Sequence, residues 1–135
     1  MAAVFADTAY YVAALIENDA LHGRAVAFDA ESPTQRTITT DAVLVEVLAY
    51  FSKRGRHARL VAVQLVDALR SDPRVTIVHQ SADLFFAGVD LYRRRLDKGY
   101  SLTDCMSMVL CSEQGITDVL THDRHFEQEG FAVLL

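Results

Sequence analysis

Four acidic side chains stand where a folded domain does not ordinarily place an isolated charge. Each of them follows or interrupts an apolar run of the chain: Asp7, Glu46, Asp104 and Asp123. Burying an ionised carboxylate costs several kcal/mol unless the group is paired or bound to a cation. Four such costs in one small chain suggest a shared compensation, and a divalent metal ion is the simplest one.

Three of these acids also have an ordinary structural explanation. Asp7 follows a predicted strand and could cap the next helix. Asp104 is the fourth residue of Ser101-Leu102-Thr103-Asp104, which has the pattern of a capping box. Asp123 could be a turn residue within segment 121–126, or could pair with a neighbouring base. Taken singly, none of the three establishes a site.

Glu46 is harder to explain structurally. On a helix, its neighbours one turn away are Ala42, Val43, Ala49 and Tyr50, which predicts that it lies on an apolar face. A buried glutamate there needs a partner, either an arginine from elsewhere or a metal ion. It is therefore the best single indicator of a site.

The type of these residues favours phosphoryl chemistry over zinc hydrolysis. Mg²⁺ and Mn²⁺ bind carboxylate oxygens, lower the pKa of a bound water and neutralise charge on phosphate oxygens. The histidines show no HxxxH or similar ligand spacing, and are interpreted as surface or turn residues rather than ligands: His22, His57, His79, His122 and His125.

Short runs of β-branched residues alternate with longer helical patterns along the chain. Strands are expected at 2–6, 36–40, 75–78, 119–121 and 131–134, and helices at 8–18, 21–31, 41–53, 60–72, 82–96 and from 101 onward. This alternation predicts a parallel sheet with helices on both faces, in one domain spanning 1–135. Ligands gather at the carboxyl ends of such strands, so the four acids are expected at one rim of the sheet.

Composition sets wider limits on function. A length of 135 residues suits a single core. The sequence contains no run of about 18 apolar residues, so no membrane span is predicted. The start of the chain lacks the basic region of a signal peptide, so we expect a cytoplasmic protein. Cys105 and Cys111 lie on different faces of one predicted helix and are expected to be buried thiols.

The net charge of −5 at first argues against a nucleic-acid partner. Metal bound to the four acids would offset part of that charge, and basic residues cluster at 53–59 and 93–98. Such clusters are commonly solvated helix ends. The net charge therefore neither supports nor excludes a nucleic-acid partner.

The chain resembles the PIN-domain ribonucleases, most closely the VapC-like toxins of prokaryotic toxin–antitoxin pairs. The resemblance extends over nearly the whole chain and rests on Asp7-Thr8-Ala9, Val45-Glu46-Val47, Ser101-Leu102-Thr103-Asp104 and the segment from Leu120 to Phe126. It implies a three-layer α/β/α sandwich around a mostly parallel sheet. Asp7, Glu46 and Asp104 match the three core acidic positions of the family, and Asp123 matches the more variable fourth. Ala9 departs from the pattern, since many relatives carry a serine there.

The resemblance also implies an activity and a mechanism. The four acids would hold one or two Mg²⁺ or Mn²⁺ ions in an endoribonuclease, in which an activated water attacks the phosphodiester and leaves a 5′-phosphate and a 3′-hydroxyl. Three hydroxyls would orient carboxylates or waters: Thr8, Thr103 and Thr121. Basic side chains would contact the RNA backbone: Arg54, Arg56, Arg59, Arg94 and Lys98.

Two kinds of protein partner follow from the same resemblance. VapC-like proteins usually form homodimers and bind a cognate antitoxin that covers the acidic site. Tyr10, Tyr11 and Leu15, with the stretch 43–51, could serve these interfaces or could equally belong to the core.

Two other functions remain as alternatives. A non-catalytic PIN-fold binding or regulatory module would have the same fold, but the presence of all four acids counts against it. A receiver-like phosphoacceptor domain needs an aspartate at the end of its central strand and a lysine after its last strand. Here His79 and Gln80 follow the strand at 75–78, and no lysine follows Phe131.

Overall fold

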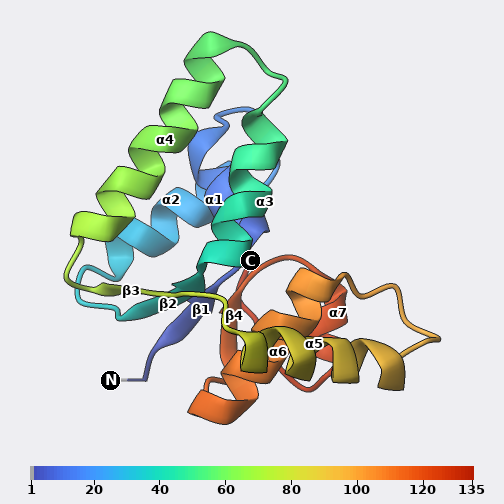
Figure 1. Ribbon diagram of the computed structural model, residues 1–135. Coiled ribbons are helices and arrows are strands. Elements are labelled where there is room, and N and C mark those ends of the chain that lie inside the picture. Colours follow the sequence, from blue (N-terminus) through green and yellow to red (C-terminus); the bar gives the residue numbers. More distant parts are fainter. Residues whose placement is uncertain (1) are drawn as a thin grey trace.

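Within residues 2–135, which the computed structural model describes, five parallel strands form one central sheet (Figure 1). The strands are β1 (Val4–Ala6), β2 (Thr37–Thr40), β3 (Val75–Val78), β4 (Asp118–Leu120) and β5 (Ala132–Val133). They follow the order β3-β2-β1-β4-β5, and every neighbouring pair is parallel. The parallel sheet expected from the alternating pattern is thereby confirmed.

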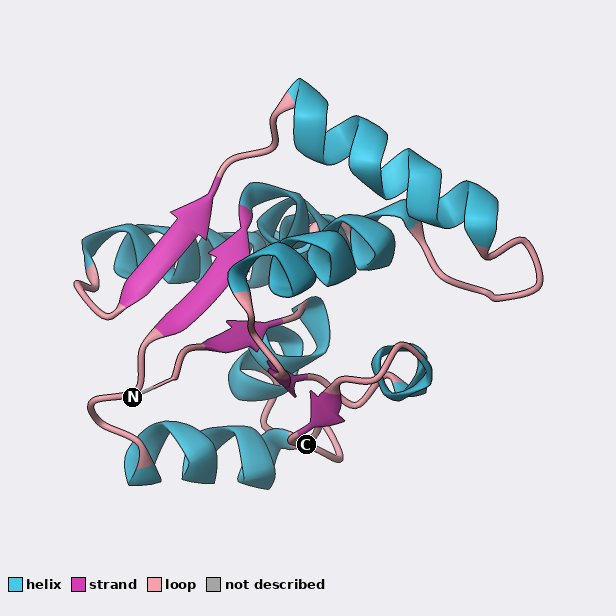
Figure 2. Ribbon diagram, turned by 90° about the horizontal axis from the view of Figure 1, so that it is seen from below, coloured by secondary structure: helices cyan, strands magenta, loops and turns pink. Residues whose placement is uncertain are grey.

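Helices cover both faces of this sheet. They are α1 (Thr8–Leu15), α2 (His22–Glu31), α3 (Asp41–Phe51), α4 (Arg56–Ser71), α5 (Ala82–Arg94), α6 (Leu102–Gln114) and α7 (Arg124–Gln128). Figure 1 shows α1 to α4 on one side of the sheet and α5 and α6 on the other, and Figure 2 shows the strands between helices from a second direction. The architecture is the expected α/β/α sandwich. None of the helices in residues 2–135 is long and apolar enough to cross a membrane.

Local sequence signals set where several helices begin and end. The Thr40 hydroxyl accepts a hydrogen bond from the Val43 amide (3.1 Å) at the start of α3, and the Ser81 hydroxyl accepts one from the Leu84 amide (3.1 Å) at the start of α5. Such caps satisfy amides that have no partner within the helix. Gly115 ends α6 in the left-handed conformation, with φ of 68°, which glycine adopts without strain.

The direction of chain travel across the sheet reverses at β1. Phe5 pairs with Ile38 of β2 on one edge of β1 and with Val119 of β4 on the other. From β1 the chain moves outward through β2 to β3, then returns through α5 and α6 to β4. In open α/β sheets such a switch point opens a crevice at the carboxyl ends of the strands. Asp7 directly follows β1, and Thr121 directly follows β4, so both lie at this switch point.

Apolar side chains of the sheet and of both helical layers form one hydrophobic core. Its largest fully buried side chains include Phe5, Val43, Met108, Leu120 and Phe126. Cys105 and Cys111 are buried free thiols, as expected. Burial raises the pKa of the Cys111 thiol to about 12, so this group stays protonated at neutral pH.

Helix α7 is not among the elements predicted from the sequence. Segment 121–126 was interpreted as a turn, whereas α7 begins at Arg124, with Asp123 as its N-cap. A five-residue helix spans little more than one turn, so it is too short to show a helical period in the sequence. The first helix also ends earlier than predicted, at Leu15 instead of residue 18. The remaining elements lie within a few residues of their predicted bounds.

Candidate active site

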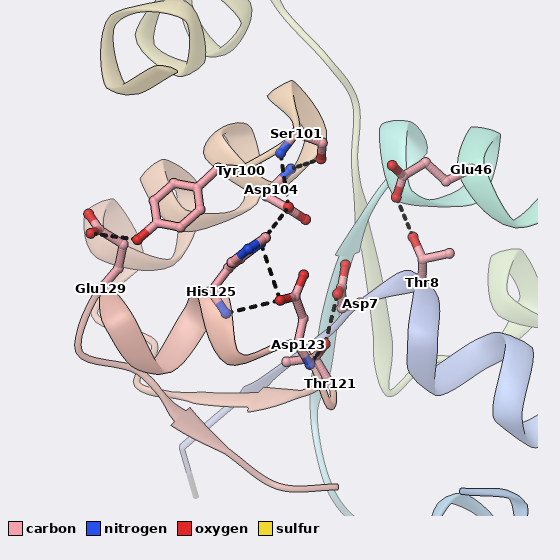
Figure 3. Close-up of polar contacts among 10 residues, drawn as sticks. All are labelled: Asp7, Thr8, Glu46, Tyr100, Ser101, Asp104, Thr121, Asp123, His125 and Glu129. Atoms are coloured by element: carbon pink, nitrogen blue, oxygen red, sulfur yellow. Dashed lines mark hydrogen bonds and ion pairs between the residues drawn. The ribbon is translucent and has the colours of Figure 1, made fainter. Parts of the chain in front are cut away.

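The four acids predicted from the sequence come from four different parts of the chain and lie near one another beyond the carboxyl ends of β1 and β4 (Figure 3). Asp7 precedes α1, Glu46 lies within α3, Asp104 lies in the first turn of α6, and Asp123 precedes α7. Their charges act on one another: Asp104 and Glu46 both raise the pKa of Asp7, and Asp123 raises that of Asp104. The rim expected from strand polarity is therefore a real cluster of carboxylates.

Asp7 is the most deeply buried of the four, at 5% exposed. Its Oδ2 accepts a hydrogen bond from the Thr121 hydroxyl (2.9 Å), but its side chain makes no capping hydrogen bond to α1. Asp7 therefore occupies the predicted N-cap position of α1, but a capping hydrogen bond does not account for its carboxylate. Its Oδ1 is buried and has no hydrogen-bond partner. Burial is the main cause that raises the pKa of Asp7 to about 7, and repulsion from Asp104 and Glu46 adds to it.

Glu46 is half-buried rather than buried, which corrects the expectation of a wholly apolar face. Its Oε1 accepts a hydrogen bond from the Thr8 hydroxyl (2.5 Å), which ties α3 to the start of α1. The helix turns Val43 and Val47 into the core instead. No arginine pairs with Glu46 among the described residues, so the first of the two partners considered for it is not found.

Asp104 does form the predicted capping box. Its Oδ2 accepts from the Ser101 amide (3.1 Å), and its own amide donates to the Ser101 hydroxyl (3.0 Å). This structural role uses Oδ2 and does not engage Oδ1. Burial, followed by the charge of Asp123, raises the pKa of Asp104. A cap and a site residue are therefore compatible roles for the same carboxylate.

Asp123 and Thr121 connect β4 to the site. Asp123 Oδ1 accepts a hydrogen bond from the His125 amide (2.9 Å) and so caps α7. Thr121 is fully buried, and its hydroxyl donates to Asp7 Oδ2 while it accepts from the Asp123 amide (3.1 Å). One hydroxyl thus connects the carboxylate of Asp7 to the main chain at Asp123. The Thr103 hydroxyl makes no hydrogen bond within residues 2–135, unlike those of Thr8 and Thr121.

His125 lies beside the acids, which differs from the interpretation of all five histidines as surface or turn residues. Its Nδ1 is 3.2 Å from Asp123 Oδ1 and 3.7 Å from Asp104 Oδ2. Ligand atoms of Asp104, Asp123 and His125 all lie within 4.8 Å of one another, as in a metal-binding group. One sequence signal could have indicated this position: Asp123 and His125 are two residues apart and directly follow a predicted strand.

A hydrogen-bonded layer behind His125 was also missed. The ring of Tyr100 lies 5.0 Å from the ring of His125, and the Tyr100 hydroxyl donates to Glu129 Oε2 (3.0 Å). Arg95 forms an ion pair with Glu129 (3.0 Å), and this contact lowers the pKa of the Glu129 carboxyl. The layer joins the end of α5 to the end of α7, and Figure 3 shows Tyr100 and Glu129 on the side of His125 that faces away from Asp7.

The basic candidates lie on two projecting parts of the molecule. The first group is at the turn between α3 and α4, where the Arg54 guanidinium lies 4.1 Å from the centre of the Tyr50 ring and Arg59 donates to the Ser52 carbonyl (3.0 Å). The second group is at the end of α5, where Arg94 is exposed and Lys98 lies 3.8 Å from Asp97. Arg56 is exposed at the start of α4.

The donor set fits a hard divalent cation. Within residues 2–135, no lysine or arginine forms an ion pair with any of the four acids, although other carboxylates of the chain have such partners. The buried Oδ1 of Asp7 also lacks a partner. Magnesium and manganese ions take carboxylate oxygens and would neutralise this concentrated negative charge.

The chain is similar to known proteins over nearly its whole length. Residues 4–131 match the PIN domain family. No curated protein sequence gives a significant match. Among solved structures, the crystal structure of Mycobacterium tuberculosis VapC20, a toxin that cleaves the sarcin–ricin loop, superposes with a TM-score of 0.85 at 28% sequence identity. The match covers 96% of this chain and 97% of that one.

Proposed function

The chain belongs to the PIN-domain family as a VapC-like ribonuclease, and we propose that Asp7, Glu46, Asp104 and Asp123 form its metal-dependent active site. The observation that carries this proposal is the convergence of four carboxylates at the switch point of the sheet without any lysine or arginine partner in the described chain. A site of this kind is costly to fold unless a cation compensates it. An endoribonuclease is therefore favoured over the alternative of a non-catalytic PIN-fold binding module.

The four acids would hold Mg²⁺ or Mn²⁺. When bound, such an ion neutralises charge on the phosphate oxygens and makes a water a better nucleophile. The protein keeps its carboxylates in place beforehand: Thr121 orients Asp7, Thr8 orients Glu46, and the amide of Ser101 orients Asp104. Each of these hydrogen bonds occupies one oxygen of a carboxylate, and the other oxygen can face the ligand. Preorganised side chains of this kind need little rearrangement during the reaction.

RNA is the substrate class that follows from the family. We propose that exposed Arg56 and Arg94, on two different projections of the molecule, contact the phosphate backbone. Arg54 and Arg59 have local partners at the α3–α4 turn, so part of their role is to hold that turn. The sarcin–ricin loop, cleaved by the similar mycobacterial toxin, is the first RNA to test.

A cognate antitoxin and a second copy of the chain are the proposed protein partners. Tyr10 and Tyr11 are buried, so they belong to the core and not to an interface. The stretch 43–51 is more suitable, because Val45 is 65% exposed and lines an open groove of about 480 Å³ between α3, α4 and β3. We propose this groove as a contact surface for the antitoxin or the second copy. Analytical ultracentrifugation of wild type and Val45→Asp tests the second copy.

The activity is tested with purified protein, a sarcin–ricin loop RNA and either Mn²⁺ or Mg²⁺. Asp7→Asn and Asp104→Asn keep the size of each side chain. The side-chain oxygen of the Asp104→Asn variant can still accept a hydrogen bond from the Ser101 amide. Asp67→Asn, at an exposed position of α4, is the matched control. We expect cleavage by wild type and Asp67→Asn and at least a hundredfold loss in the other two, in line with the about 10²–10³ attached to losing one charge-stabilising group. Equal cleavage by all four proteins would refute the site assignment.

A further inference from the structure

We infer that His125 is a nitrogen ligand of the proposed metal site and that it shifts the selectivity of this site from Mg²⁺ toward transition-metal ions such as Mn²⁺. The inference rests on the proposed function, because it assumes that the four acids hold a divalent ion. It goes beyond that function by adding a ligand of different chemistry to an all-carboxylate set.

The fold presents the imidazole of His125 to the acids. The amide of His125 donates to Asp123 Oδ1 in the N-terminal turn of α7, and its side chain then points back toward Asp104 (Figure 3). The ring packs against Tyr100, whose hydroxyl is held by Glu129. Gly99 closes the outer edge of the ring: a Cβ atom at that position would lie 3.6 Å from Nε2. The imidazole is therefore held in place before any ion binds.

The position of Nδ1 matches a ligand better than a hydrogen-bond donor. This nitrogen is buried and makes no hydrogen bond, although a carboxylate oxygen lies 3.2 Å away and a second one 3.7 Å away. Neighbouring ligands of an octahedral ion, each about 2.1 Å from the metal, are about 3 Å apart. The 3.2 Å between Nδ1 and Asp123 is close to this spacing, and Asp104 offers an oxygen within the same 4.8 Å group, so the unpartnered nitrogen lies where a cation could be shared with these carboxylates.

Asp7 gives a second, independent indication that the neighbouring acids bind a cation. Its side chain is more than nine-tenths buried, and its free Oδ1 belongs to the same group of acids, since the charge of Asp104 acts on it. Two buried atoms without hydrogen bonds, one oxygen and one nitrogen, thus belong to one cluster (Figure 3). A cation bound among these acids would compensate the charge that both atoms face.

The chemistry of the ligands predicts the selectivity. Mg²⁺ is a hard ion that prefers oxygen ligands and retains its waters. Imidazole nitrogen is a common ligand of the transition-metal ions, whose affinities rise from Mn²⁺ through Co²⁺ to Cu²⁺. Replacing an oxygen by this nitrogen therefore favours Mn²⁺ over Mg²⁺. A histidine that only positioned the acids would affect both ions equally.

Pulsed electron paramagnetic resonance of Mn²⁺ tests ligation directly, because a coordinated imidazole nitrogen couples to the electron spin. The metal-stripped protein is loaded with Mn²⁺ alone, without RNA. We expect nitrogen coupling in wild type and in His122→Ala, and its loss in His125→Ala. His122 is the matched control, since it is an exposed histidine three residues away that contacts the Leu135 carbonyl.

Calorimetry with Mn²⁺ and with Mg²⁺ tests the selectivity on the same proteins. We expect His125→Ala to lower the affinity for Mn²⁺ by at least about tenfold, which is the usual effect of disturbing a metal-bound histidine. The affinity for Mg²⁺ should fall by much less. Equal losses for both ions would overturn the inference. So would Mn²⁺ binding to wild type without nitrogen coupling, a result that needs no variant and leaves the proposed function standing. A wild type that binds no Mn²⁺ overturns both.

Discussion

Asp7→Asn should stabilise the metal-free protein while it removes the nuclease activity. The Asp7 carboxyl is 5% exposed, has one oxygen without a partner and lies near two other acids. In the absence of a cation, its negative charge therefore opposes folding. The neutral amide of asparagine has nearly the same shape, can accept from Thr121 and can donate toward the neighbouring carboxylates.

The pKa of Asp7 gives the magnitude. Burial raises it from 3.8 to about 7. One pKa unit corresponds to about 1.4 kcal/mol, so ionised Asp7 destabilises the folded protein by about 4 kcal/mol. The amide must also be desolvated, so we expect Asp7→Asn to gain about 2–4 kcal/mol at about pH 8.

The sign of the pH dependence follows from the same pKa. Between about pH 4 and pH 7 the folded state binds more protons at Asp7 than the unfolded state, so the stability of wild type falls as pH rises through about 7. Asp7→Asn lacks this loss. Its advantage over wild type should therefore be about 2–3 kcal/mol larger at about pH 8 than at about pH 5.

Urea unfolding in the presence of a chelator, repeated from about pH 5 to pH 8, measures this difference. Asp67→Asn is the control for removal of an exposed aspartate and should follow wild type. Adding Mn²⁺ should reduce the advantage of Asp7→Asn, because a ligand at 100 times its dissociation constant stabilises wild type by about 2.7 kcal/mol and Asp7→Asn by less. The reasoning fails if Asp7→Asn is no more stable than wild type at about pH 8, or if its advantage does not change with pH.

Two further substitutions test the supports of the site. Thr121→Val keeps the buried volume but removes the hydroxyl shared by Asp7 and the Asp123 amide, so we expect a loss of about 1–3 kcal/mol in urea unfolding and a lower cleavage rate in the RNA assay. Gly88→Ala places a Cβ atom 2.5 Å from Met106 Cγ where α5 packs on α6, so we expect a loss of about 1–3 kcal/mol, with RNA cleavage per folded molecule unchanged. An unchanged urea-unfolding midpoint would contradict the hydrogen-bond argument for Thr121→Val and the packing argument for Gly88→Ala.

The sheet and the acidic rim could be predicted because their signals are local. A strand of β-branched residues followed by an acid, repeated with intervening helices, specifies both the parallel sheet and the edge where its carboxyl ends meet. Asp7 after β1 and Asp123 after β4 are positions of this kind. The capping box at Asp104 is also local, and the structure confirms it.

The roles of the surrounding residues could not be predicted because they depend on distant contacts. Thr121 is 114 positions from Asp7, and no pattern near either residue indicates that they share a hydrogen bond. His125 reaches Asp104 only because α7 forms, and that helix is too short for a periodic signal. The same applies to the contact of Arg95 with Glu129, which joins two helices that are separated by α6 and β4 in the sequence.

The contacts of the four acids also explain how the fold tolerates such a site. Asp104 and Asp123 each use one oxygen to cap a helix, where the helix dipole favours negative charge, so part of their cost is offset by a structural role. Glu46 is half-buried and keeps access to solvent. Asp7 has neither compensation: it makes no cap, it is buried, and one oxygen has no partner. The energetic conflict between fold and function is therefore concentrated in a single residue. Among the four acids, Asp7 is the one whose removal should most stabilise the metal-free protein.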